Sequence, residues 1–159
     1  MRSKSIFITL FLFIFAFCNA QSNNSFQEKI SELYPDATQV SWQNNGIYKV
    51  ALFDHNDFAM KVWLNKKAEW VMSVLDIQKT DELPTKVNNA FALSQYSKWN
   101  VSNVYWTTFS NRQEEFIIKV NNTKSTQTKE IFYSPSGEEI RNINVGYNNS
   151  NITPKLFGL

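Results

Sequence analysis

Two stretches of the chain have the apolar spacing of an amphipathic helix. The first apolar face consists of Phe26, Ile30, Leu33 and Tyr34. The second consists of Leu83, Val87, Ala90 and Phe91, each 57 positions after its counterpart (83 minus 26). Pro35 ends the first helix, and Pro84 stands near the first turn of the second. The identical spacing predicts an internal repeat that opens with a helix.

Alternating apolar and polar residues follow each helix and predict strands. Segments 40–42, 48–52 and 63–64 in the first half correspond to 104–106, 116–120 and 132–133 in the second. Turn residues such as Asn45-Gly46 and Ser136-Gly137 separate the strands, so we expect hairpins rather than parallel crossovers. We therefore predict an α+β fold of two tandem units, about 25–77 and 81–143, each a helix packed on an antiparallel sheet of about four strands.

Both ends of the chain differ from this pattern. Residues 1–20 predict a signal peptide, because Arg2 and Lys4 precede an apolar run and Cys18-Asn19-Ala20 suits cleavage. Cleavage leaves a domain over 21–145 and places the protein in the periplasm or outside the cell. Lipid anchoring at Cys18 is one alternative, and an uncleaved anchor is another. Residues 146–159 are rich in Asn, lack periodicity and are expected to form a flexible tail.

Composition narrows the class of protein. The 159 residues are 43% hydrophobic and 15% aromatic, which excludes a disordered or collagen-like chain. Without Arg2 and Lys4, 14 basic residues balance 14 acidic ones, so nothing indicates nucleic acid binding or membrane insertion of the mature chain. The one Cys lies in the signal peptide, so disulfides, a catalytic thiol and a Cys metal site are excluded from the mature chain.

Candidate catalytic chemistry is limited to His55, the one His in the sequence. It stands in Asp54-His55-Asn56-Asp57, which is typical of a hairpin turn. Calcium loops and zinc sites need more ligands than this segment offers. The sequence also lacks the motifs of common hydrolases and nucleotide-binding proteins. We therefore predict no catalytic residue, no metal site and no cofactor.

Alternation along the strands divides their residues between two faces of the sheet. The face expected against the helices holds Trp42, Tyr48, Val50, Leu52, Met60, Val62, Trp106, Phe116, Ile118 and Val120. The other face mixes aromatic, Lys and Glu side chains, as protein interfaces do. The residues predicted to bind a partner there are Lys49, Phe53, Lys61, Trp63, Tyr105, Lys119 and Phe132. We expect Trp63 and Phe132 to be exposed at its centre. The alternative is a solvated face whose aromatic residues pair across strands.

The combined pattern resembles the PepSY-like, beta-lactamase-inhibitor-like proteins that Gram-negative bacteria export. The residues that carry the resemblance are Leu33-Tyr34-Pro35, Val40-Ser41-Trp42, Tyr48-Lys49-Val50, Leu83-Pro84, Val87, Ala90-Phe91 and 131–137. The resemblance implies tandem helix-and-sheet units, a signal peptide and no enzymatic activity. It also implies a fold similar to proteins that hold beta-lactamases on a concave sheet and to propeptide modules that restrain peptidases. The mature chain departs from the disulfide-stapled inhibitors because it has no Cys.

The leading hypothesis is a non-catalytic, inhibitor-like binding module of the cell envelope. It would hold a protein or peptide of the envelope on the exposed sheet face. One alternative is a small envelope hydrolase or metal-dependent enzyme that uses His55. Another is a structural subunit that assembles by strand addition at a sheet edge.

Overall fold

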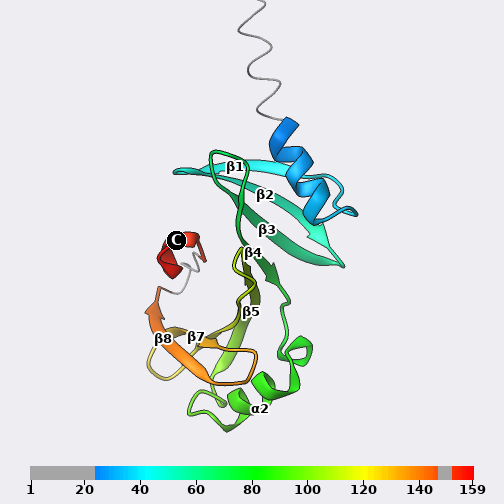
Figure 1. Ribbon diagram of the computed structural model, residues 1–159. Coiled ribbons are helices and arrows are strands. Elements are labelled where there is room, and N and C mark those ends of the chain that lie inside the picture. The colour runs from blue at the N-terminus through cyan, green and yellow to red at the C-terminus, as the bar shows by residue number, and fades with distance from the viewer. Residues whose placement is uncertain (1–23, 147–151) are drawn as a thin grey trace, which may run out of the picture.

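Eight strands form one antiparallel sheet in the computed structural model of the protein, which describes residues 24–146 and 152–159. Each strand pairs with the next along the chain, from β1 to β8 (Figure 1). The strands are β1 (Ser41–Asn45), β2 (Tyr48–His55), β3 (Phe58–Leu64), β4 (Trp70–Asp76), β5 (Asn100–Phe109), β6 (Glu114–Asn121), β7 (Thr128–Tyr133) and β8 (Glu139–Val145). The helical elements are α1, described over 24–33, α2 (Thr85–Leu93), and the 3-10 turns η1 (Thr80–Glu82) and η2 (Pro154–Phe157). The predicted signal peptide, 1–20, lies outside the described residues.

The prediction of two tandem helix-on-sheet units is wrong. The eight strands make one continuous sheet, because β4 pairs with β5 from Met72 opposite Phe109 to Asp76 opposite Tyr105. The described part of the chain contains only two short α-helices, so the fold is mostly β. The repeat pattern does not reveal this pairing, since it describes each half and not the contact between them. An unpaired strand edge exposes backbone donors and acceptors, and pairing β4 with β5 satisfies them.

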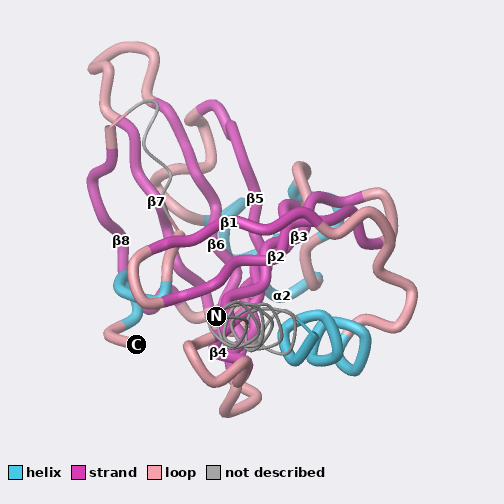
Figure 2. Tube along the Cα trace, turned by 90° about the horizontal axis from the view of Figure 1, so that it is seen from above, coloured by secondary structure: helices cyan, strands magenta, loops and turns pink. Residues whose placement is uncertain are grey.

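One side of the sheet, called the helix face below, is covered by α1 and α2 (Figure 2). Ile30 of α1 is 0% exposed, and Val87 and Phe91 of α2 are 0% and 6% exposed, so both predicted apolar helix faces are confirmed. Tyr34 follows α1, and its hydroxyl donates to Ser73 Oγ at 2.8 Å. Burial raises the pKa of Tyr34 above its ordinary value of 10.0, as expected for a phenol packed between helix and sheet.

The opposite side of the sheet, called the inner face below, also carries a buried apolar cluster. It contains Val50, Trp63, Met72, Val74, Phe109, Ile117, Phe132 and Ile152. Ile152 comes from the last part of the chain, and η2 follows it on the side of the sheet away from α1 and α2 (Figures 1 and 2). This packing of 152–159 differs from the flexible tail expected over 146–159. Three large apolar side chains in the segment, Ile152, Leu156 and Phe157, provide the physical reason.

Gly137 is required where α2 rests on the turn between β7 and β8. Its φ is +87°, and a Cβ added there would lie 2.6 Å from the Lys86 carbonyl oxygen of α2. Gly46 also has a positive φ, +62°, but an added Cβ would meet nothing within 4 Å. Both changes to Ala incur the left-handed backbone cost, whereas only the change at Gly137 also creates a clash.

We expect Gly137→Ala to lower the free energy of unfolding by about 1–3 kcal/mol more than Gly46→Ala does. Urea denaturation of both variants, followed by circular dichroism, measures the difference. Equal losses in the two variants would contradict close packing of α2 on this turn.

Candidate binding surface on the inner face

A hollow of about 180 Å³ lies on the inner face between the strands of the first half and β5. Its wall includes the polar residues Gln43, Asn45, Lys61 and Asp76 and the aromatic residues Trp63 and Tyr105. The antiparallel register produces this grouping, because Val50 lies opposite Trp63 and Asp76 lies opposite Tyr105. Ile152 of the chain end closes one part of the wall.

Trp63 combines burial with an unused hydrogen-bond donor. Its side chain lines the hollow, yet the residue is only 3% exposed. Its indole N–H has no hydrogen-bond partner among the described residues. Tyr105 is half-buried and Lys61 is exposed, so a partner at the hollow could contact both side chains directly, as it could the exposed Gln43 and Asn45. Trp63 therefore forms part of the supporting wall.

A second hollow lies beside η2, and its lining includes Phe109, Glu115, Arg141 and Phe157. Arg141 of β8 places its guanidinium 4.0 Å from the ring centroid of Phe132 and 5.3 Å from that of Phe157. Its Nη2 lies 3.2 Å from Glu115 Oε2, so the charge of Arg141 is paired within the protein. The rings on either side shield this ion pair, and the cation stacks on them favourably. Two aromatic rings, Phe109 and Phe157, and one internal ion pair thus form part of the wall of this hollow, together with polar and aliphatic residues.

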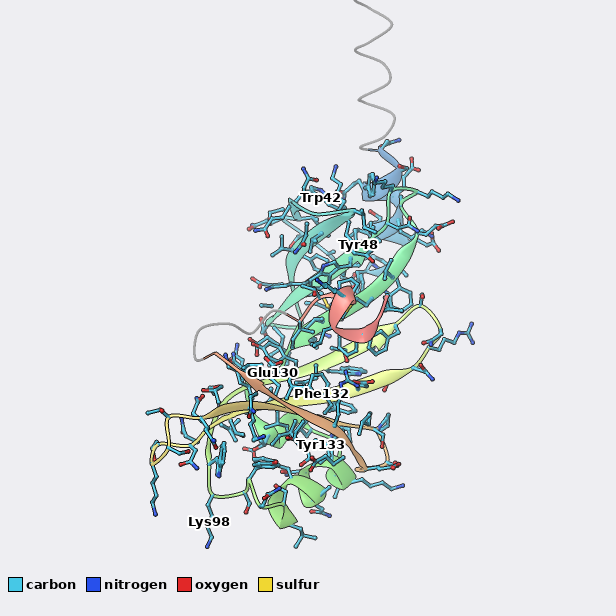
Figure 3. The ribbon with its side chains drawn as sticks, turned by 90° about the vertical axis from the view of Figure 1, so that its left-hand side faces the viewer. Trp42, Tyr48, Lys98, Glu130, Phe132 and Tyr133 are labelled. Atoms are coloured by element: carbon cyan, nitrogen blue, oxygen red, sulfur yellow. The ribbon has the colours of Figure 1, made fainter. Side chains whose placement is uncertain are left out.

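The structure brings together five of the seven residues predicted to bind a partner. Lys61, Trp63, Tyr105, Lys119 and Phe132 all belong to the inner face by strand register and packing. Their exposure differs from the expectation, because Trp63 and Phe132 are 3% and 0% exposed instead of lying in solvent. Figure 3 looks onto this face and shows η2 in front of the sheet. Whether any of these residues binds a partner stays a prediction.

Lys49 and Phe53 lie on the helix face, contrary to the predicted face. Lys49 Nζ is 4.8 Å from the ring centroid of Phe26 and 5.2 Å from that of Trp42. Phe53 is 7% exposed and packs 5.4 Å from the ring of Tyr34. The other residues of this strand are reversed in the same way. The structure places on the inner face three residues that were expected against the helices: Tyr48, Val50 and Leu52.

The alternation in β2 fails as a guide because this strand is covered on both sides. Val50, Ala51, Leu52 and Phe53 form a continuous apolar run. Ala51 and Phe53 belong to the helix-face cluster, whereas Val50 and Leu52 pack into the inner-face cluster. A strand buried on both faces reads as uniformly apolar, so its pattern does not identify the face toward the helices. Trp42, Met60, Val62 and Phe116 do lie on the helix face as predicted.

A buried pair of opposite charges lies between β6 and β7 on the inner face. Lys119 of β6 stands directly opposite Glu130 of β7. They are 5% and 1% exposed, although residues of these types are almost always solvated. Lys119 was predicted from the sequence as a contact residue, but its burial indicates a structural role within the face.

His55 lies apart from both hollows. It is the last residue of β2, with its ring 5.4 Å from Tyr34, and its Nε2 is 3.3 Å from the Asn56 amide nitrogen. Asn56 and Asp57 form the turn, with φ values of 52° and 67°.

No group of three potential metal-ligating side chains occurs in the described ranges. Over the same ranges no helix is long and apolar enough to cross a membrane.

Comparisons with solved structures find similar proteins in Bacteroides. A DUF2874 family protein of Bacteroides uniformis is 37% identical, with a TM-score of 0.76 over 80% of this chain and 93% of that one. A protein of Bacteroides eggerthii, described provisionally as periplasmic, is 36% identical, with a TM-score of 0.73 over 78% and 91%. A BLIP-like protein of Bacteroides fragilis is 26% identical, with a TM-score of 0.77 over 83% and 92%.

Neither protein-family models nor curated proteins match the chain. The beta-lactamase-inhibitor-like part of the predicted resemblance is supported by the BLIP-like relative, whereas the PepSY-like part stays a prediction. The identity to the Bacteroides uniformis protein extends over four fifths of the chain, and the two share one fold. The chain belongs to the DUF2874 family.

Proposed function

We propose that the protein is a non-catalytic binding module of the periplasm, which holds a protein or peptide on the inner face of its sheet. The observation that carries this proposal is the hollow bounded by Lys61, Asp76, Trp63 and Tyr105. It combines an aromatic side chain with charges of both signs on a face that neither helix covers. The BLIP-like relative supports a role in protein binding.

Within the hollow, different residues have different roles. Tyr105 is the aromatic anchor, because it is half-buried and offers a large contact area at low entropic cost. Lys61 is exposed beside it and attracts an acidic group of the partner, which sets orientation and association rate. Trp63 and Phe132 lie beneath the surface and hold its shape.

Two separate observations support the periplasm as the compartment. The first 20 residues have the charge and apolar pattern of a secretory signal. The relative from Bacteroides eggerthii is described as periplasmic, although provisionally. The partner is therefore a protein or peptide that shares the periplasm with this chain.

We expect Tyr105→Ala and Lys61→Glu each to weaken capture of an envelope partner by about tenfold or more, the scale of an interface hot spot. Lys49→Glu is the matched control, because Lys49 lies on the helix face of the neighbouring strand. Each variant serves as bait for periplasmic extract, and the captured protein is then titrated against all three variants. Thermal unfolding confirms that each bait is folded.

Equal capture by Lys61→Glu, Tyr105→Ala and the unaltered protein would show that the hollow is not the binding site. Loss of capture in Lys49→Glu alone would show that the binding site lies on the helix face. These two outcomes separate the faces of the sheet whatever the identity of the partner.

A further inference from the structure

The end of the chain already occupies part of the inner face. Ile152 is 7% exposed and contributes to the wall of the hollow with Trp63 and Tyr105. Phe157 packs edge-on against Phe109 at 4.8 Å and Phe132 at 6.2 Å between ring centroids. The segment 152–159 thus packs Ile152, Leu156 and Phe157 against the face proposed to bind a partner. Figure 3 shows its 3-10 turn, η2, in front of the sheet.

The described residues of this segment are held by side-chain contacts. The backbone hydrogen bonds of Leu156, Gly158 and Leu159 run to Thr153, Lys155 and Pro154, all within the segment. The sheet strands, in contrast, are joined to each other by continuous ladders. A short segment that is held by a few apolar side chains can detach without breaking the sheet, because local opening requires only the loss of its own contacts.

We propose that the inner face is a receptor for an apolar peptide segment of a partner protein, and that 152–159 fills the receptor as an intramolecular stand-in. This inference rests on the proposed function, since it places the partner on the same face. An approaching partner displaces 152–159 before it reaches Trp63 and Phe132.

The contacts of the segment specify the chemistry of the partner. An aromatic side chain enters between Phe109 and Phe132, where the Arg141 guanidinium also stacks on it. An aliphatic side chain takes the place of Ile152 beside Tyr105. A carboxylate gains little at the aromatic position, because Arg141 is already paired with Glu115 at 3.2 Å.

The tether makes the segment an effective competitor. A linked ligand acts at an effective concentration in the millimolar range, so a free peptide of the same sequence competes poorly with it. Weakening the tethered segment should therefore open the site to an added peptide. Phe157 is the residue to change, and Lys155 offers a control because its side chain is exposed.

The test uses the full chain and a fluorescent peptide with the sequence of residues 152–159. By fluorescence anisotropy, the Phe157→Ala protein is expected to bind the peptide at least tenfold more tightly than the unaltered protein does. Lys155→Ala protein should bind like the unaltered one. A peptide with Ala in place of its Phe should lose at least tenfold in affinity for the Phe157→Ala protein. Circular dichroism verifies the fold of each variant.

The proposal is overturned if folded Phe157→Ala protein does not gain affinity, or if both peptides bind equally. If that variant does not fold, hydrogen exchange of the unaltered protein decides. The amides of Leu156, Gly158 and Leu159 should then exchange at least 100-fold faster than those of β6 and β7, and equal protection would overturn the proposal.

A dimer that forms by exchange of 152–159 would also overturn it, because the occupant would be a second copy. Capture of the envelope partner is a separate measurement, so failure of the peptide assay and failure of the proposed function are distinguishable.

Discussion

Phe132→Ala is expected to lower the free energy of unfolding by about 3–5 kcal/mol, the range for truncating a buried aromatic side chain. Phe132 is 0% exposed near the end of β7 and contacts groups from two other parts of the chain. The Arg141 guanidinium covers its ring at 4.0 Å, and the ring of Phe157 approaches its edge at 6.2 Å. Removing the ring leaves a cavity. It also removes the aromatic contact of the Arg141 guanidinium, which pairs with Glu115.

Urea denaturation of the purified variant measures this loss. Leu93→Ala provides the control, because Leu93 is 89% exposed at the end of α2 and should change stability by about 0.5 kcal/mol or less. A loss below about 1 kcal/mol for Phe132→Ala would mean that Phe132 is exposed, as the strand pattern alone predicted.

Lys119→Met should also cost about 3–5 kcal/mol, for an electrostatic reason. Glu130 is 1% exposed, and Lys119 stands directly opposite it on the neighbouring strand. Replacing Lys119 with an apolar side chain of similar length keeps the packing but leaves a carboxylate buried without the opposing charge. The desolvation of Glu130 is then no longer offset.

The double variant Lys119→Met with Glu130→Met separates this effect from lost packing. Removing both charges should recover most of the stability, since apolar replacements of a buried pair are often neutral or stabilising. Equilibrium unfolding of the two single variants and the double variant completes a double-mutant cycle. Additive losses in the cycle would show that the two charges do not depend on each other.

Local features could be predicted from the sequence because they depend on neighbouring residues. The apolar spacing of α1 and α2 identified Ile30, Val87 and Phe91, and all three are buried against the sheet. The turn chemistry was also readable, since Gly46 and Gly137 both adopt the positive φ that glycine favours. A helix face repeats every 3.6 residues and a tight turn spans four, so the pattern needs no information from distant parts of the chain.

Faces of the sheet could be predicted only in part. β3, β5, β6 and β7 place Lys61, Trp63, Tyr105, Lys119 and Phe132 on one side, as alternation indicated. The prediction was wrong in β2 for Lys49 and Phe53, because this strand has apolar cover on both sides. The burial of a residue also depends on which other segments cover its face of the sheet. Alternation within a strand does not predict that cover.

The amino-acid sequence alone indicates the two helices, the hairpin connections and the apolar side chains available for burial. The pairing of β4 with β5 into a single sheet, and the packing of Ile152 and Phe157 on its inner face, depend on long-range contacts that become visible in the folded structure. Those contacts join residues far apart in the chain, such as Phe109 with Phe157. Their free energy depends on surfaces that exist only after the strands have assembled, so no local periodicity records them.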